Sequence, residues 1–144
     1  MIFMASTGIS AEKTASEISI ILSRSNMVKY IQFEYDEGSI TGISFIIMVG
    51  AKRLPFKLPA RWEPVLDAMN NDRRTPRHLC NPDQARRVAW RQLLRWVQAQ
   101  MALIEIGMVD IKEIFMSYLK VTDGQTLYES LEKKSFMITA DAGK

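Results

Sequence analysis

The chain has 144 residues, 47% hydrophobic and 24% charged, and its 19 Lys and Arg exceed its 16 Asp and Glu to give a net charge of +3. A chain of this length can bury enough surface to fold without disulfides or a structural metal, which excludes a small disulfide-stapled scaffold. A single cysteine, Cys80, excludes an intramolecular disulfide and favours a reducing cytoplasm. No apolar run approaches the ~20 residues that a membrane span requires.

The first predicted elements are a helix and a strand. Ser10 can cap a helix beginning at Ala11, because its hydroxyl accepts a hydrogen bond from an unpaired N–H of the first turn. Asn26 is expected to end this helix in a left-handed conformation. Residues 28 to 35 alternate with a period of two and are rich in β-branched and aromatic side chains, which predicts a strand. One helix face is apolar: Ala11, Ala15, Ile18 and Leu22.

A hairpin and an edge strand are predicted next. Residues 36 to 39, Asp-Glu-Gly-Ser, are typical of a tight turn into a second strand at 40 to 49, because glycine accepts positive φ. A third strand covers 53 to 58, where Pro55 lacks an N–H and places the strand at the edge of the sheet. A short helix at 62 to 71 completes the order α-β-β-β-α.

The second half of the chain is predicted to be helical after an exposed connector. Residues 71 to 80 lack hydrophobic periodicity, which indicates a loop. Asn81 and Pro82 then give agreeing signals for the start of a long helix that runs to Ile106 and is ended by Gly107. Shorter helices are predicted at 110 to 119 and 126 to 133.

The expected fold is therefore α+β, with a three-stranded antiparallel sheet followed by a long central helix and one or two short C-terminal helices. One domain covers residues 1–138, and residues 139–144 form a disordered tail. The α-β-β-β-α order is also that of double-stranded RNA-binding domains, but the lysine-rich motif that these domains present at the start of their second helix is absent from residues 60 to 64. The likeness is one of topology.

Positive charge is concentrated in one segment. Residues 73 to 104 hold seven arginines and one acid, a local charge of +6, whereas both flanking segments are weakly acidic. Three arginines recur every fourth residue of the long helix and are predicted to form a stripe, whose mutual repulsion requires a balancing partner. The predicted binding surface is Arg73, Arg74, Arg77, Arg87, Arg91, Arg95 and Gln98.

Three interpretations of this surface remain open. Arginine recognises phosphates, so the surface can bind nucleic acid. It can instead dock on an acidic protein. In the third interpretation, Arg91 and Arg95 pair with carboxylates of neighbouring elements, for which the candidates are Glu105, Asp110 and Glu113.

Catalytic and metal sites are not expected. His78 and Cys80 supply only two ligands, and the chain has no other His or Cys. A hairpin turn accounts for the acidic cluster of Glu34, Asp36 and Glu37 without catalysis. The three tryptophans are expected in the core rather than as base-stacking platforms: Trp62, Trp90 and Trp96.

Several segments spread over most of the chain form a recognisable pattern: Ala11–Thr14 with Glu17–Ile18, Leu54–Pro59, Gln84–Arg91, Trp96–Gln100 with Ala102–Glu105, and Thr126–Glu129. Together they resemble a group of small phage and prophage proteins without an assigned activity. The resemblance implies a bacterial or phage setting and roles such as DNA metabolism or interference with host defence. It carries no catalytic residues.

We therefore expect a non-enzymatic, phage-like protein of the bacterial cytoplasm that binds nucleic acid, DNA in preference to RNA, without a cofactor. Its arginines would neutralise phosphates, with little readout of bases. The alternative is an inhibitor or adaptor that binds an acidic host protein involved in defence or DNA metabolism. The oligomeric state is expected to be monomer or, in slight preference, homodimer.

Overall fold

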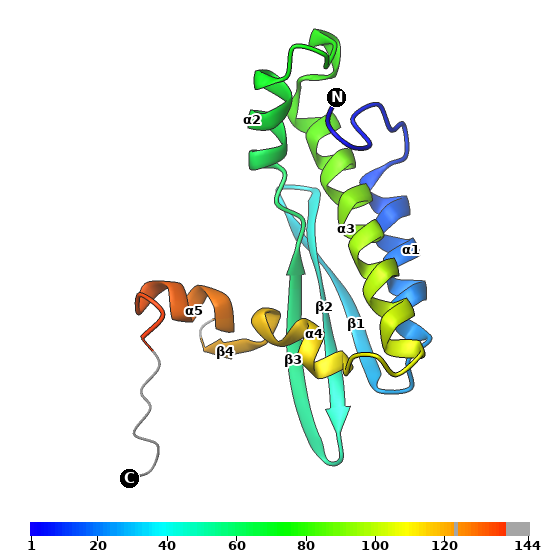
Figure 1. Ribbon diagram of the computed structural model, residues 1–144, viewed down its shortest axis with the longest axis vertical. Helices are drawn as coiled ribbons and strands as arrows, with labels where there is room; N and C mark the ends of the chain where they lie inside the picture. Colours follow the sequence, from blue (N-terminus) through cyan, green and yellow to red (C-terminus); the bar gives the residue numbers. More distant parts are fainter. Residues whose placement is uncertain (123, 138–144) are drawn as a thin grey trace.

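The computed structural model describes residues 1–122 and 124–137, and the predicted tail at 139–144 lies outside these residues. The α+β class and the order α-β-β-β-α followed by a long helix are confirmed (Figure 1). Short 3-10 turns lie at Arg77–Leu79 and Met116–Tyr118. The helices and strands are α1 (Ala11–Ser23), β1 (Val28–Asp36), β2 (Ser39–Val49), β3 (Lys52–Pro59), α2 (Glu63–Asn71), α3 (Pro82–Glu105), α4 (Ile111–Phe115), β4 (Lys120–Thr122), β5 (Gln125–Thr126) and α5 (Leu127–Lys133).

The main sheet is antiparallel with the strand order β1-β2-β3. The predicted turn joins β1 to β2 through Glu37 and Gly38, whose φ angles of 50° and 81° are those of a hairpin turn that matches the twist of the strands. β3 is an edge strand of this sheet, as Pro55 predicts. Beyond it, Leu119 forms a single bridge with Phe56 and brings the C-terminal segment alongside β3.

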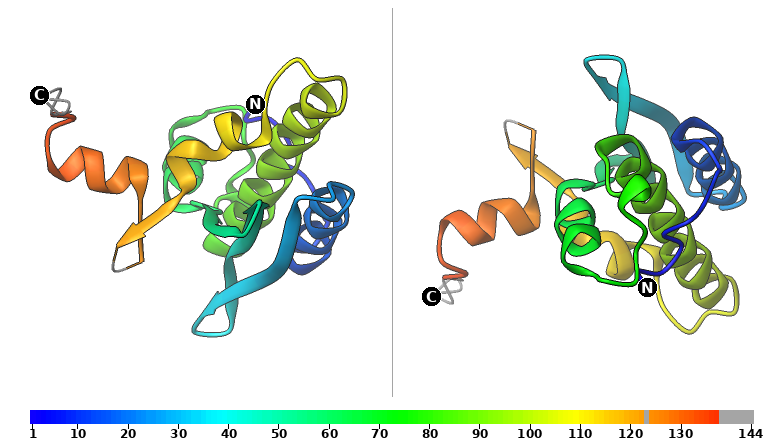
Figure 2. Two further views of the ribbon diagram at one scale, coloured as in Figure 1. Left: turned by 90° about the horizontal axis from the view of Figure 1, so that it is seen from below. Right: turned by 90° about the horizontal axis from the view of Figure 1, so that it is seen from above.

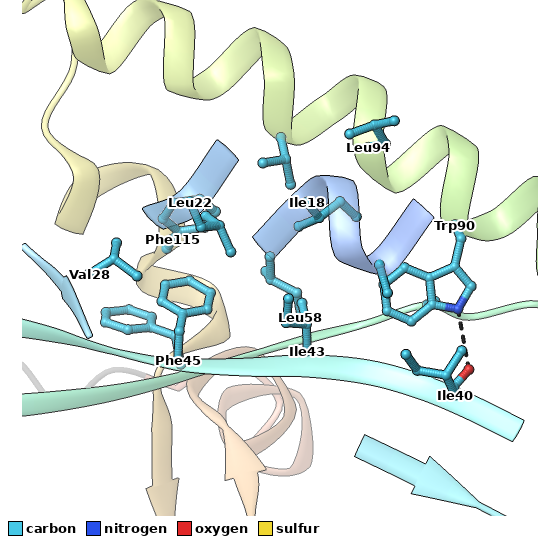
Figure 3. Packing of buried hydrophobic residues seen from close by; sticks show 14 of the residues in the cluster. Ile18, Leu22, Val28, Ile40, Ile43, Phe45, Leu58, Trp90, Leu94 and Phe115 are labelled. Carbon is cyan, nitrogen blue, oxygen red and sulfur yellow. Dashed lines mark hydrogen bonds between the residues drawn. The ribbon is translucent and has the colours of Figure 1, made fainter. Parts of the chain in front are cut away.

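The core lies between one face of the sheet and the helices α1 and α3, which pack side by side (Figure 2). Ile43 and Phe45 of β2 point towards these helices (Figure 3). Trp90 of α3 is fully buried, and its Nε1 donates a hydrogen bond to the backbone oxygen of Ile40 at 3.2 Å. Phe115 of α4 packs edge-on against Phe45, with 5.4 Å between ring centroids. These contacts fix α3 over the sheet.

Local signals place the ends of α3 correctly. The Asn81 side chain accepts a hydrogen bond from the backbone N–H of Gln84 at 2.9 Å, and Pro82 occupies the first turn. The helix ends at Glu105, one residue before the predicted end, and Gly107 follows with a φ of 79°.

The prediction that Asn26 ends α1 in a left-handed conformation is wrong. The helix ends at Ser23, and Arg24 at its C-cap is right-handed with a φ of −69°. The turn into β1 is closed by Ser25 instead: its backbone oxygen accepts from the N–H of Val28 and its hydroxyl from that of Met27. Local serine hydrogen bonds therefore replace the expected left-handed asparagine.

The C-terminal segment departs from the predicted helix at 110 to 119. α4 ends at Phe115, a 3-10 turn follows, and the chain then becomes extended because Leu119 pairs with β3. A small hairpin, β4 and β5, precedes α5, which projects to one side of the main sheet (Figures 1 and 2). This hairpin is not predicted from the sequence, since strands of three and two residues carry too little periodicity to be detected.

Candidate nucleic-acid interface

The connector between α2 and α3 is organised by Asp72. Its carboxylate accepts hydrogen bonds from the Thr75 hydroxyl at 2.8 Å and from the backbone N–H of Arg74 at 3.1 Å. These two bonds stabilise the charged form and lower the pKa of Asp72 to about 2. The N-terminal ammonium lies 3.8 Å from the same carboxylate. Asp72 thus holds the turn from which the connector arginines project.

The connector carries three arginines, all of them exposed: Arg73, Arg74 and Arg77. We call them the connector arginines. The Nε of Arg74 lies 3.4 Å from Asp72, yet its side chain remains 78% exposed. Among residues 1–122 and 124–137, neither Arg73 nor Arg77 belongs to a salt bridge. Three guanidinium groups within five residues are therefore accessible to an anionic ligand.

The predicted stripe on α3 is interrupted at Arg91. This residue is only 7% exposed because α1 covers it. Its Nη1 donates to Oε1 of Glu17 at 3.0 Å and lies 3.4 Å from the Thr14 hydroxyl. The placement of Arg91 on an exposed binding surface is therefore wrong, whereas the interpretation that it pairs with a carboxylate is correct.

The carboxylate that pairs with Arg91 is not one of the three named from the sequence. Glu17 comes from α1, which packs along α3 through the buried residues Thr14, Ala15 and Ile18. A helix wheel of α3 alone assigns the Arg91 arc to solvent, because it contains no information on where α1 lies. The sequence signal that could have identified this pair is the acid at position 17, which lies next to the apolar stripe of the first helix.

The two remaining arginines of the predicted stripe donate hydrogen bonds to glutamines of their own helix. The Nε of Arg87 donates to Oε1 of Gln84 at 2.9 Å, and the side chain is half-buried. Arg95 is exposed, and its Nη1 donates to Oε1 of Gln98 at 3.0 Å. Gln98 also lines an open cavity of about 430 Å³ between the C-terminal halves of α1 and α3. The predicted surface thus separates into the connector arginines and the weaker pair Arg87 and Arg95.

Gln84, in the first turn of α3, has a structural role. It is buried, and its Nε2 donates to the backbone oxygens of Ala5 at 2.8 Å and Thr7 at 2.9 Å. These bonds attach the N-terminal segment to α3. Gln84 is therefore not accessible to a ligand.

The tryptophans lie where the core interpretation places them. Trp96 packs edge-on against Phe115 and Tyr118, with centroid distances of 5.6 and 5.8 Å. Trp62 is half-buried, with the Arg86 guanidinium 4.6 Å from its ring centroid. None of the tryptophans is an exposed stacking platform.

Other titratable groups show no metal-binding arrangement. Within the described ranges, no group of three or more His, Cys, Asp and Glu residues is placed to hold a metal ion. His78 is exposed, while the Cys80 thiol lies 3.4 Å from the backbone oxygen of Met69. Of the helices that the structure describes, none is both long and apolar enough to cross a membrane.

A polar row across the sheet was not singled out from the sequence. Glu34 of β1 accepts a hydrogen bond from the Ser44 hydroxyl and lies 3.3 Å from Lys57 Nζ and 3.6 Å from Lys120 Nζ. Burial raises the pKa of Glu34, but the Ser44 hydrogen bond and the two ammonium groups outweigh this effect and lower it overall. The row lies on the sheet face opposite α3, where the alternation of β3 places Lys57.

Comparison with known proteins identified no relatives: no protein-family model, no curated protein and no solved structure matched the chain.

Proposed function

We propose that the protein binds nucleic acid through the connector arginines, Arg73, Arg74 and Arg77. The observation that supports this proposal is their exposure on a turn held by Asp72, with no salt bridge to Arg73 or Arg77 within the described residues. Exposed guanidinium groups suit phosphate oxygens, because they offer planar pairs of donors and are always charged.

Arg95, and to a smaller extent Arg87, would add a second, weaker group of phosphate contacts on α3. Contacts of this kind neutralise phosphates and release counterions, so the affinity falls as salt rises. They carry little sequence information, because phosphate contacts fix position rather than identity. The proposed activity is binding without catalysis, in a bacterial cytoplasm and a phage setting, with DNA preferred to RNA.

A salt series tests the proposal. Fluorescence anisotropy with labelled oligonucleotides of about 20 nucleotides, single-stranded and duplex, gives the affinity from low to moderate salt. Replacing the three connector arginines with glutamine should lower the affinity and make the log–log salt dependence shallower by about two to three units, since each lost phosphate contact removes roughly 0.7–0.9. The melting temperature should stay at the parent value.

The matched control removes the same charge elsewhere. Lys13, Lys133 and Lys134 are exposed cations of α1 and of the region around α5. Replacing them with glutamine should leave the salt dependence within about one unit of the parent. Equal losses of affinity in both variants would show that net charge alone accounts for the binding. No affinity for either oligonucleotide at low salt, together with binding to polyglutamate, would overturn the proposal in favour of an acidic protein partner.

A further inference from the structure

The face of the sheet opposite α3 is uncovered by helices in the described part of the chain (Figure 2). Strand register assigns its side chains, because residues paired across the strands share a face. Lys29 pairs with Ile46, which pairs with Pro55, and Met48 pairs with Arg53. We call this surface the open face. Besides the residues just named, it comprises Tyr30, Gln32, Ser44 and Lys57, together with Glu34 and Lys120 of the same polar row.

Tyr30 reaches this face because β1 is bulged. Lys29 pairs with Ile46 and Gln32 with Ser44, so Tyr30 and Ile31 together oppose a single residue of β2. Tyr30 has a φ of 54°, a left-handed conformation that is unfavourable for a large aromatic residue. The bulge turns its ring away from the core, while Ile31 packs against the core. The backbone therefore adopts a costly conformation at the residue that presents an aromatic ring to solvent.

The Tyr30 ring is already paired with a cation. The Arg53 guanidinium lies 4.8 Å from the ring centroid, which places the ring on the same face as Arg53. The side chain of Tyr30 is nevertheless 67% exposed, and Lys29 and Gln32 beside it are also exposed. An aromatic ring backed by a guanidinium group and flanked by a lysine offers stacking and charge neutralisation at one position.

The charge of the open face selects its partner. Lys29, Arg53, Lys57 and Lys120 outnumber the one carboxylate, Glu34, so a second copy of the face would be repelled. The acidic hairpin turn that follows Tyr35 lies at the opposite end of β1 from Tyr30. Half-buried Ile46 and Met48 form an apolar strip beside the ring. A partner that combines planar apolar rings with negative charge matches these features.

We infer that the open face binds single-stranded nucleic acid, with a base stacked on Tyr30 and phosphates near Lys29 and Arg53. Bases in a duplex are stacked on each other and cannot reach the ring, so the inference specifies single strands as the ligand. It rests on the part of the proposed function that assigns nucleic acid as the ligand, and it deepens that part. Tyr30 lies near the start of β1, whereas the connector lies beyond α2, past the end of the sheet at which β1 ends (Figure 1). A strand of about 20 nucleotides is ~70 Å long even when stacked, which exceeds the ~30 Å length of β1.

The test distinguishes binding through stacked bases from binding through phosphates alone. The probes are an oligothymidine of about 20 nucleotides, an abasic strand of equal length and a duplex. Tyr30→Asn removes the ring but keeps a residue that tolerates left-handed backbone, and Tyr30→Phe keeps the ring. Tyr35→Asn is the matched control, since Tyr35 is an exposed tyrosine of the same strand. Melting curves establish that each variant is folded.

The expected result is that Tyr30→Asn binds oligothymidine about 5- to 150-fold more weakly, the range for one lost stacked base. Binding of the abasic strand should not change, and Tyr30→Phe and Tyr35→Asn should bind as the parent does. An unchanged affinity of folded Tyr30→Asn for oligothymidine would overturn the inference, as would equal affinity of the parent for abasic and oligothymidine strands.

The connector variant distinguishes this failure from failure of the proposed function. If the connector arginine variant binds weakly while Tyr30→Asn binds as the parent does, the open face is excluded and the proposed function stands. If Tyr30→Asn binds weakly while the connector variant is unaffected, the open face is supported and the connector is excluded. If the parent binds no nucleic acid, both are excluded.

Discussion

Arg91 and Arg77 carry the same charge in opposite surroundings. Arg91 is 7% exposed beneath α1 and paired with Glu17, whereas Arg77 is exposed on the connector and has no salt bridge among the described residues. The difference shows that arginines spaced along one helix do not define a surface until the neighbouring helix is placed. The connector has few apolar residues, so its arginines are exposed without reference to a neighbouring helix, even though Thr75 in the same segment is buried.

The largest effect on stability is expected at Arg91. Arg91→Ala leaves the Glu17 carboxylate without its partner and removes a buried side chain between α1 and α3. We expect the free energy of unfolding to fall by about 2 kcal/mol. This is less than the roughly 3–5 kcal/mol expected for a fully buried pair, because water reaches Glu17. The melting temperature should fall by about 4–8 °C. Thermal unfolding followed by circular dichroism measures this change.

Arg91→Met is the control, because it fills the same space without the charge and should cost less than the alanine variant. The affinity for nucleic acid should be unchanged in the folded alanine variant. A variant that melts as the parent does but loses its affinity would instead place Arg91 on the ligand surface.

A smaller effect is expected at the other two arginines of the predicted stripe. Replacing Arg87 and Arg95 with glutamine should change the free energy of unfolding by less than about 0.5 kcal/mol, since neither belongs to a salt bridge among the described residues. The salt dependence should become shallower by about one unit, chiefly through Arg95. Adding Arg91→Gln to this pair should then lower the melting temperature, and its failure to do so would contradict the division of the stripe.

The smallest effect is expected at Asp72 and is local to the connector. Its folded-state pKa of about 2 lies below the usual 3.8, so its stabilising effect is present above about pH 4 and is lost as the pH falls through 2. Asp72→Asn should mimic this loss at neutral pH by weakening the bonds to Arg74 and Thr75. Hydrogen exchange of the Arg74 amide, which donates to the carboxylate, should become faster while the amides of α3 keep their rates. Unchanged exchange at Arg74 would show that the turn does not depend on the carboxylate.

Local chemistry accounts for what the sequence could predict. Ser10, Asn81 and Gly107 define helix ends through interactions within a few residues, and all three are confirmed. The burial of Arg91 depends on Glu17, far away in the sequence, and the extension after Met116–Tyr118 depends on Leu119 meeting Phe56 of β3. The Tyr30 bulge likewise arises from strand register, which a period of two does not reveal.

The comparison between Arg91 and the connector is tested most directly by nuclear magnetic resonance of the arginine Nε–H groups during titration with single-stranded oligothymidine. We predict that the signals of Arg73, Arg74 and Arg77 shift together as the oligonucleotide is added, while the signal of Arg91 stays in place. Shifts confined to Arg91, or no shift at the three connector arginines at an oligonucleotide concentration that saturates binding, would contradict the account.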